Sequence, residues 1–166
     1  WNGNAFRKFK LLVQIGRVFT NKLICCSDYI RSAVVKDFQI MNSETTVIYN
    51  SCADKFFKVA RSNKKKNKIT LGMVARLEIH KDHHTLISAC WILKNKGIEF
   101  ELLLIGDGSK REAIQNHISK CQLEKHVFIL GARRDITYIL SKLDLFIFSA
   151  KPDEGFGIAL AEAMAS

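Results

Sequence analysis

The chain has 166 residues, of which 48% are hydrophobic and 25% charged, a balance that is typical of a globular protein and unlike that of a disordered one. Its longest apolar stretches are far too short to span a bilayer. The net charge of +10 lies entirely within residues 1–68, whereas residues 69–166 are balanced. Such a basic segment could meet nucleic acid, an anionic membrane or a phosphorylated ligand, or it could form a solvated linker. Neither interleaved aromatic residues nor an RNP-like motif accompanies it, which argues against nucleic acid.

The two ends and the cysteines set further expectations. The chain opens at Trp1 without a signal-peptide pattern and stops at Ser166 inside a predicted helix, so we expect a piece of a longer protein. None of the five cysteines forms a CxxC pair, which argues against a zinc ribbon or a thioredoxin-like site. Cysteines within apolar patterns favour a reducing, cytoplasmic setting.

The first part of the chain carries short and separated signals. Strands are predicted at 22–26 and 47–49, with a helix at 29–36 between them. The residues that follow are polar and strongly basic, which is typical of a connector. We therefore predict a domain remnant, a basic interdomain linker and a complete-looking domain, which correspond to residues 1–50, 51–67 and 68–166.

From Lys68 onward, short apolar runs alternate with amphipathic stretches. Fully apolar strands joined by helices indicate a parallel sheet that is covered on both faces, so we predict an α/β, Rossmann-like fold. The predicted strands are 69–74, 100–105, 127–130 and 143–148. The predicted helices are 82–96, 110–121, 136–140 and one that starts near 157.

Polar residues follow the first two of these strands. In an open parallel sheet, ligands bind at the carboxyl ends of the strands. Arg76 and Lys81 bracket a turn that leads into a helix, and two cations in that position suit a diphosphate. Taken alone, they could equally be surface charges. Gly106 and Gly108 would let the backbone approach a ligand closely, although most turns of this kind only connect two elements.

The segment after the fourth strand carries the most chemical information. Gly155 and Gly157 free the backbone beside a helix start, so that amides can face the crevice. Glu154 lies in the same loop. Glu162 stands among small apolar residues of the following helix, where an ionised carboxylate needs partners such as ligand hydroxyls. The alternative is a glutamate on the solvent side of an amphipathic helix.

A histidine cluster, His80, His83 and His84, lies at the turn into the first helix of this part. A metal site is conceivable there, but no acidic residue or further histidine completes a ligand set. Solvated histidines at a helix start explain the pattern. We therefore expect neither a metal nor a cofactor.

These motifs resemble the retaining, two-domain glycosyltransferases of the GT-B type, the group 1 or glycogen-synthase-like superfamily, which includes sucrose synthase and bacterial lipopolysaccharide and capsule sugar transferases. The most specific element is the Glu-x7-Glu spacing of Glu154 and Glu162. The resemblance implies that the third part is the C-terminal, donor-binding domain, truncated at its end, and that the first part is a remnant of the acceptor-side domain. The segments that carry the resemblance are 72–77 with Lys81, 104–108, 127–131 and 154–162, and more weakly 27–30 and 47–50.

For the two cations, the resemblance implies a catalytic role. Arg76 and Lys81 would hold the diphosphate of the donor and stabilise the charge that grows on the leaving nucleotide, a role played elsewhere by a metal. The leaving phosphate would help to deprotonate the acceptor. Asp82 stands where the family often has glycine, and we expect it to cap the helix.

For the donor itself, the resemblance implies two carboxylate contacts. Glu162 would bind the ribose hydroxyls, and Glu154, as a catalytic residue, would hold the donor sugar together with the backbone amides of Phe156 and Gly157. Arg133, after the third strand, would lie beside the base.

The implied function is transfer of a sugar, with retention, from a UDP-, GDP- or ADP-sugar to a glycan or lipid-linked acceptor in polysaccharide, lipopolysaccharide or other glycoconjugate biosynthesis. The expected location is the cytoplasm, with peripheral contact to the inner face of a membrane as a further hypothesis. Because most of the acceptor domain is missing, we expect the chain itself to be inactive. The alternatives are a non-catalytic nucleotide-sugar-binding module and, from charge alone, a nucleic-acid-binding protein.

Overall fold

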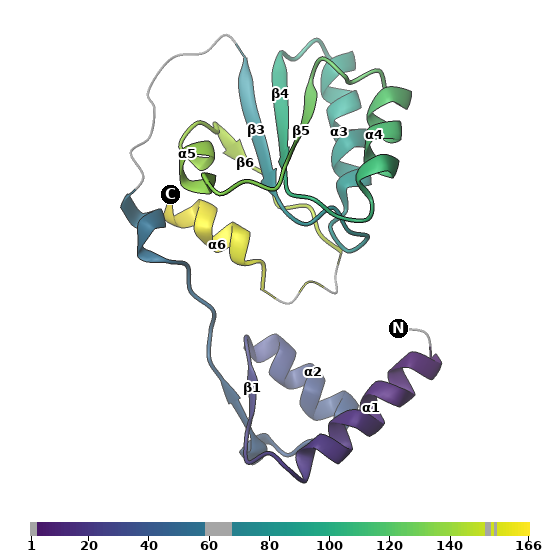
Figure 1. Cartoon of the computed structure of the whole chain (residues 1–166), viewed down its shortest axis with the longest axis vertical. Helices are drawn as coiled ribbons and strands as arrows, with labels where there is room; N and C mark the ends of the chain where they lie inside the picture. Colours follow the sequence, from purple (N-terminus) through teal and green to yellow (C-terminus); the bar gives the residue numbers. More distant parts are fainter. Residues whose placement is uncertain (1–2, 59–67, 152–153, 155) are drawn as a thin grey trace. The chain divides into compact units, whose positions relative to one another are not determined.

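The computed structural model describes residues 3–58, 68–151, 154 and 156–166 (Figure 1). Contacts between residues divide the chain into two compact units, Trp1–Ser51 and Cys52–Ser166. All five cysteines are free. Among the described residues, no helix combines the length and the apolar character that a membrane crossing requires.

The first unit is a small parallel strand–helix–strand motif preceded by a helix. Strands β1 (Leu23–Cys25) and β2 (Thr45–Val47) pair in parallel on either side of α2 (Asp28–Phe38) and the short 3-10 helix η1 (Asn42–Glu44). The Ser27 hydroxyl caps α2 by accepting a hydrogen bond from the Ile30 amide at 3.2 Å. β1 and α2 match the predicted strand 22–26 and helix 29–36, whereas β2 lies two residues earlier than the strand predicted at 47–49 and shares only Val47 with it. Helix α1 (Gly3–Arg17) was not predicted, and its first turn carries no acidic residue to signal a helix start.

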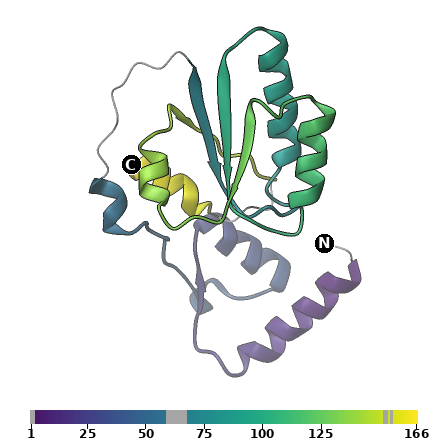
Figure 2. The same cartoon turned by 45° about the horizontal axis from the view of Figure 1, so that its top comes forward.

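The second unit is built on a four-stranded parallel sheet. Its strands are β3 (Ile69–Val74), β4 (Phe100–Ile105), β5 (Val127–Gly131) and β6 (Leu145–Phe146), in the order β5-β4-β3-β6. Its helices are α3 (His83–Asn95), α4 (Arg111–Lys120), α5 (Ile136–Leu140) and α6 (Ile158–Ala165). Figures 1 and 2 show α3 and α4 on one side of the sheet and α5 and α6 on the other. This arrangement confirms the predicted Rossmann-like fold.

Apolar side chains on the strands and on two helices form the core of this unit. Leu102 and Leu104 of β4 are completely buried and pack in one cluster with Ile87 of α3 and Ile118 of α4. Burying an aliphatic side chain of this size stabilises the fold by about 1.5–3 kcal/mol. Residues of both faces of the strands are apolar because helices cover both faces.

The strand order creates a crevice at one point of the sheet. The chain runs from β3 to β4 on one side of β3, and later returns to place β6 on the other side. Connections that leave a strand in opposite directions separate at its carboxyl end, which is where open α/β sheets bind ligands. The loops that follow β3 and β6 therefore face the same crevice.

The last strand is much shorter than predicted. β6 contains only Leu145 and Phe146, whereas a strand was predicted over 143–148. Asp144 binds β3 in another way, since its carboxylate accepts a hydrogen bond from the Thr70 amide at 2.7 Å. The side chain of Leu143 lies against Gly72 in the middle of β3. Only Leu145 and Phe146 are paired as strand residues, but the amides of Asp144 and Ile147 also donate to the Thr70 and Gly72 carbonyls of β3, at 2.8 and 2.7 Å.

The segment 51–67, predicted as a linker, contains an ordered turn. The 3-10 helix η2 (Asp54–Lys58) contacts α6, and its Phe56 is only 3% exposed. One aromatic side chain within a basic stretch is enough to fix this turn, because it buries a large apolar surface. Residues 59–67, with the lysine run, lie outside the described residues.

Gly106 fixes the distance between the loops that follow β3 and β4. Its φ is +143°, and a Cβ at this position would lie 1.9 Å from the carbonyl oxygen of Ala75. The Gly106 amide also donates to the Gly131 carbonyl at 2.9 Å, so the backbone is held from both sides. Only glycine fits this conformation in this space.

We expect Gly106→Ala to lower the free energy of unfolding by more than about 3 kcal/mol, because steric overlap with the main chain adds to the positive φ. Gly97→Ala is the matched control, since Gly97 also has a positive φ of +71° but no atom within 4 Å of the added Cβ. Its cost is strain alone, about 1–2 kcal/mol. Urea unfolding followed by the fluorescence of Trp91 measures both, and equal losses would contradict the steric argument.

Candidate functional site

The loops after β3 and β6 are joined by hydrogen bonds at the carboxyl end of β3. This is the switch point of the sheet, where the connections to β4 and β6 separate. The Lys151 amide donates to the His80 carbonyl at 3.0 Å, and the Ser149 hydroxyl donates to the Asp82 carbonyl at 2.8 Å. Asp82 also caps α3, as predicted, because its carboxylate accepts a hydrogen bond from the Thr85 amide at 3.3 Å. These contacts hold the start of α3 against the segment that leads to Glu154.

Lys81 and Glu154 form an ion pair across this junction. The Lys81 ammonium donates to Glu154 Oε2, and the two side chains are only 14% and 23% exposed. The ammonium also lies 5.8 Å from the centre of the Phe148 ring. Sequence reasoning placed both charged residues in the site, and the structure brings them into contact. Each would be costly to hold in this half-buried position without a partner.

Arg76 supplies a second cation in the loop that carries Lys81. Its side chain is exposed, and none of the described carboxylates pairs with it within ion-pair distance. The loop thus offers one guanidinium that is free to move and one ammonium that is already engaged. Both belong to the loop at the carboxyl end of the central strand β3.

Glu78 fixes the shape of the loop between these two cations. Its carboxylate accepts hydrogen bonds from the Ser109 amide at 3.0 Å and from the Ser109 hydroxyl at 2.9 Å. The Leu77 carbonyl accepts from the Lys110 amide at 2.9 Å. Together these bonds attach the middle of the cation loop to the start of α4. No local pattern predicts this contact, since 31 positions separate Glu78 from Ser109.

The two glycines predicted to approach a ligand lie against protein backbone in the structure. Gly106 faces the Ala75 carbonyl, and a Cβ on Gly108 would lie 2.6 Å from the Leu77 carbonyl. Their visible role is therefore to let two loops pack closely. A contact of either glycine with a donor stays a prediction.

The start of α6 lies beside the same junction. Gly157 has a φ of +78°, and a Cβ there would lie 2.6 Å from the Phe148 ring. In the part of the chain that the structure describes, the amides of Phe156 and Gly157 have no hydrogen-bond acceptor. A contact of these two amides with an anion or a sugar hydroxyl stays a prediction. Gly155, the other predicted glycine, lies outside the described residues.

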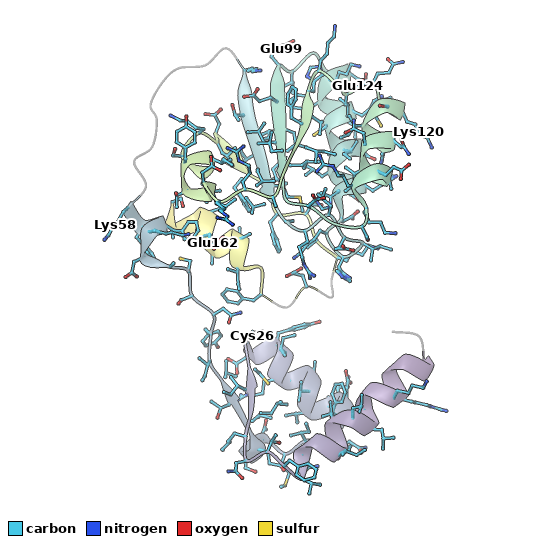
Figure 3. All side chains as sticks on the ribbon, in the orientation of Figure 1. Cys26, Lys58, Glu99, Lys120, Glu124 and Glu162 are labelled. Atoms are coloured by element: carbon cyan, nitrogen blue, oxygen red, sulfur yellow. The ribbon has the colours of Figure 1, made fainter. Side chains whose placement is uncertain are left out.

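Glu162 lies within α6 itself, beyond the helix start (Figure 3). It is half-buried, and burial raises the pKa of its carboxyl group, while the charge of Lys55 acts in the opposite direction. Lys55 belongs to η2, which contacts α6. A carboxylate in this setting has an unsatisfied capacity for hydrogen bonds, which is what sugar hydroxyls supply.

Arg133 lies away from the other candidates. It follows β5, the edge strand, which β4 separates from β3. Its guanidinium binds both carboxylate oxygens of Asp135 at 2.8 and 2.7 Å. Asp135 precedes α5 but makes no side-chain cap, because its carboxylate is engaged by the arginine. The predicted contact of Arg133 with the base of the nucleotide stays a prediction.

The histidine cluster is dispersed by the fold. His83 is 3% exposed and its ring contacts the Lys81 carbonyl, so burial lowers its pKa. The ring of His84 packs instead against His117 of α4. Among the described residues, no three histidine, cysteine or carboxylate side chains converge as a metal site would require.

The chain is similar to a protein family, to individual known proteins and to solved structures. Residues 54–166 match the family model described as "Glycosyl transferases group 1". The chain is 36% identical over 99 residues to the amylovoran biosynthesis glycosyltransferase AmsK of Erwinia amylovora, which is 55% of this chain and 24% of that protein.

A relative from Campylobacter jejuni matches a longer part of the chain. It is named N-acetylgalactosamine-N,N'-diacetylbacillosaminyl-diphospho-undecaprenol 4-alpha-N-acetylgalactosaminyltransferase, and it is 28% identical over 134 residues, 80% of this chain and 35% of its own length. The crystal structure of Anabaena Alr3699/HepE in complex with UDP-glucose superposes with a TM-score of 0.84 at 25% identity, over 99% of this chain and 47% of that one. The chain thus spans between a quarter and a half of the lengths of these proteins.

The bond between Glu78 and Ser109 can be tested through a pKa. Hydrogen bonds from the Ser109 amide and then from its hydroxyl lower the pKa of Glu78. Because the folded value lies below the unfolded one, the stability that this bond contributes is present above the unfolded pKa and is lost as the pH falls through the folded pKa. We expect Ser109→Ala, which keeps the amide, to raise the pKa of Glu78 part of the way to its ordinary value. Carboxyl-carbon NMR titration measures it, with Glu112 of α4 as the internal control, and an unchanged Glu78 value would contradict the bond.

Proposed function

This chain belongs to the group 1 glycosyltransferases, and we propose that the protein containing it transfers a sugar, with retention of configuration, from a nucleotide sugar to a glycan or lipid-linked acceptor. The observation that carries the proposal is the contact of Lys81 with Glu154 at the switch point of the sheet. It joins a cation for a diphosphate to a carboxylate for a sugar, at the place where this fold binds ligands. The remaining candidates take roles around this pair.

In the proposed donor complex, Arg76 and Lys81 bind the diphosphate. The bond between the sugar's anomeric carbon and the phosphate oxygen breaks, and negative charge grows on the diphosphate as the nucleotide leaves. These two cations stabilise that charge more strongly in the transition state than in the ground state. The acceptor oxygen bonds to the anomeric carbon on the face from which the nucleotide leaves, while the same phosphate oxygen accepts the proton of the acceptor hydroxyl, which gives retention. No metal is required for this step.

Donor binding would exchange the partner of Lys81. A diphosphate oxygen replaces the Glu154 carboxylate, which then accepts hydrogen bonds from hydroxyls of the donor sugar. The unoccupied amides of Phe156 and Gly157 bind the sugar or the phosphate from the helix start. One ion pair in the empty site thus becomes two separate contacts with the donor.

The other end of the donor would lie along α6. We assign the ribose hydroxyls to Glu162, whose carboxyl group is half-buried and has its pKa raised by that burial. Gly106, Gly108 and the region of Arg133 border the carboxyl edge of β4 and β5, and we assign the base to that edge. Gly155 belongs to the same donor loop in this proposal.

The relatives support the class of donor and of acceptor. The Anabaena protein was crystallised with UDP-glucose, which favours a UDP-sugar over the GDP- and ADP-sugars also considered. The name of the Campylobacter relative describes an acceptor carried on diphospho-undecaprenol, and the Erwinia relative is named for biosynthesis of a polysaccharide. A glycan or lipid-linked acceptor is therefore the acceptor we propose, with the enzyme acting from the cytoplasm at a membrane face.

The two charged residues can be tested in the full-length protein with UDP-, GDP- and ADP-sugars as donors. We expect Lys81→Ala and Glu154→Gln each to lower kcat/KM by about 100-fold or more, because each removes a contact with the reacting part of the donor. Lys125→Ala and Glu112→Gln are matched controls on exposed positions of the same unit. Transfer that survives both site substitutions unchanged would refute the proposed roles, and donor binding without any transfer would favour a binding module.

Glu162 can be tested through the ribose. We expect the wild-type protein to bind UDP more tightly than 2′-deoxy-UDP, by about 1–3 kcal/mol, because the deoxy ligand leaves the carboxylate unpaired. In Glu162→Gln this difference should shrink, whereas in Glu112→Gln it should persist. Calorimetric titration of UDP and of 2′-deoxy-UDP into the wild type and into Glu162→Gln gives the coupling directly. An undiminished difference in Glu162→Gln would move the ribose elsewhere.

A further inference from the structure

A second cavity lies in the same unit, between the first turns of α3 and α4 and the loop that follows β3. Its volume is about 220 Å³. Its floor is apolar, with Ile87 and Ile114 contributing from the two helices. Eight polar or charged side chains line its wall: Glu78, Lys81, Asp82, His83, His84, Lys110, His117 and Lys151. We call it the His84–His117 cavity. Lys81 lines the cavity, whereas Arg76, Glu154 and Glu162 do not, so the cavity borders the proposed diphosphate contacts but not the proposed sites of the sugar and the ribose.

The carboxylates that border the cavity are already bound within the protein. Both oxygens of Glu78 accept hydrogen bonds from Ser109. Both oxygens of Asp82 accept from Thr85, one from the amide and one from the hydroxyl. The third cation of the wall, Lys81, is paired with Glu154. These groups are therefore not available to a ligand without breaking a bond.

The remaining charged groups of the wall are cations. In the described part of the chain, no carboxylate lies within ion-pair distance of the ammonium groups of Lys110 or Lys151. The imidazole rings of His84 and His117 lie with their centres 3.7 Å apart. The Nδ1 atom of His117 is buried and has no hydrogen-bond partner. Four nitrogen side chains from two helices and a loop thus converge on one cavity.

From this arrangement we infer that the His84–His117 cavity binds a phosphate group, either inorganic or on a small organic molecule. Four donors that approach from separate elements suit a tetrahedral dianion better than a planar carboxylate. The apolar floor and the volume leave space for an organic substituent on the phosphate. This phosphate would be held by His84, His117, Lys110 and Lys151, next to Lys81, whose ammonium is paired with Glu154.

Proton uptake accompanies binding at this site. Burial, then the neighbouring His84 and Lys120, lower the pKa of His117 and so favour the neutral ring in the empty cavity. A dianion beside the ring favours the imidazolium form and supplies the counter-charge that the two adjacent rings lack. The affinity for an anion of constant charge therefore rises as the pH falls. Sulfate is such an anion, whereas phosphate itself changes charge near neutral pH.

The test uses the full-length protein with carbon-13-labelled histidine, titrated with sulfate, inorganic phosphate and phenyl phosphate. We expect saturable shifts of the ring signals of His84 and His117, tighter binding of phenyl phosphate than of phosphate, and sulfate affinity that weakens from about pH 6 to about pH 8. His126, which stacks on Phe100 outside the cavity, is the internal control. Equal and unsaturable shifts of all histidines, or sulfate affinity that is independent of pH, would overturn the inference.

Two substitutions test whether Lys110 and His117 hold the anion. Lys110→Gln and His117→Gln should each weaken sulfate and phosphate binding by about tenfold. Lys125→Gln, the same change at another exposed position, should leave it unaltered. Lys110 is exposed, so its substitution keeps the test valid if His117→Gln fails to fold. Undiminished anion affinity in Lys110→Gln would overturn the inference. UDP titration of the same samples separates this site from the proposed donor site, because a protein that binds phosphate here but no UDP would refute only the proposed function.

Discussion

The placement of β4 and β6 on opposite sides of β3 is the constraint on which the site depends. Lys81 and Glu154 are separated by 73 positions in the sequence, yet they meet because the connections from these strands separate at the carboxyl end of β3. The apolar faces of the sheet determine that arrangement, since each strand must be covered by helices on both sides. The core thus positions two charged groups that contribute nothing to it.

Close packing between loops converts this topology into a defined geometry. Gly106 and Gly108 let the loop after β4 lie directly against the backbone of Ala75 and Leu77, and Glu78 fastens the same loops through Ser109. The loop that carries the cations is therefore held along its length. Residues that look like ligand contacts in the sequence can thus serve the ligand indirectly, by fixing the backbone that presents Lys81.

Much of the second unit was predictable because its signals are local. The strands β3, β4 and β5 consist of short apolar runs, and the residues after them lie at the ligand-binding edge by topology alone. Pairings across the fold were not predictable: the sequence separation of Glu78 from Ser109, or of His84 from His117, leaves no local pattern. The short ladder of β6 was missed for a related reason, since an apolar run shows burial but not which residues form hydrogen bonds.

The state of Lys81 explains how a half-buried site can favour an anion. An ammonium group that is 14% exposed needs a compensating charge at all times, because an unpaired charge in this setting is costly. Glu154 supplies that charge in the empty site. In the proposed donor complex, the diphosphate would replace one anion by another without desolvating a free cation, so the unfavourable part of binding would be reduced. A neutral ligand could not make this exchange, because it would leave Lys81 without a counter-charge. If the donor binds as proposed, the ion pair that keeps the empty site stable therefore also selects for negative charge in the ligand.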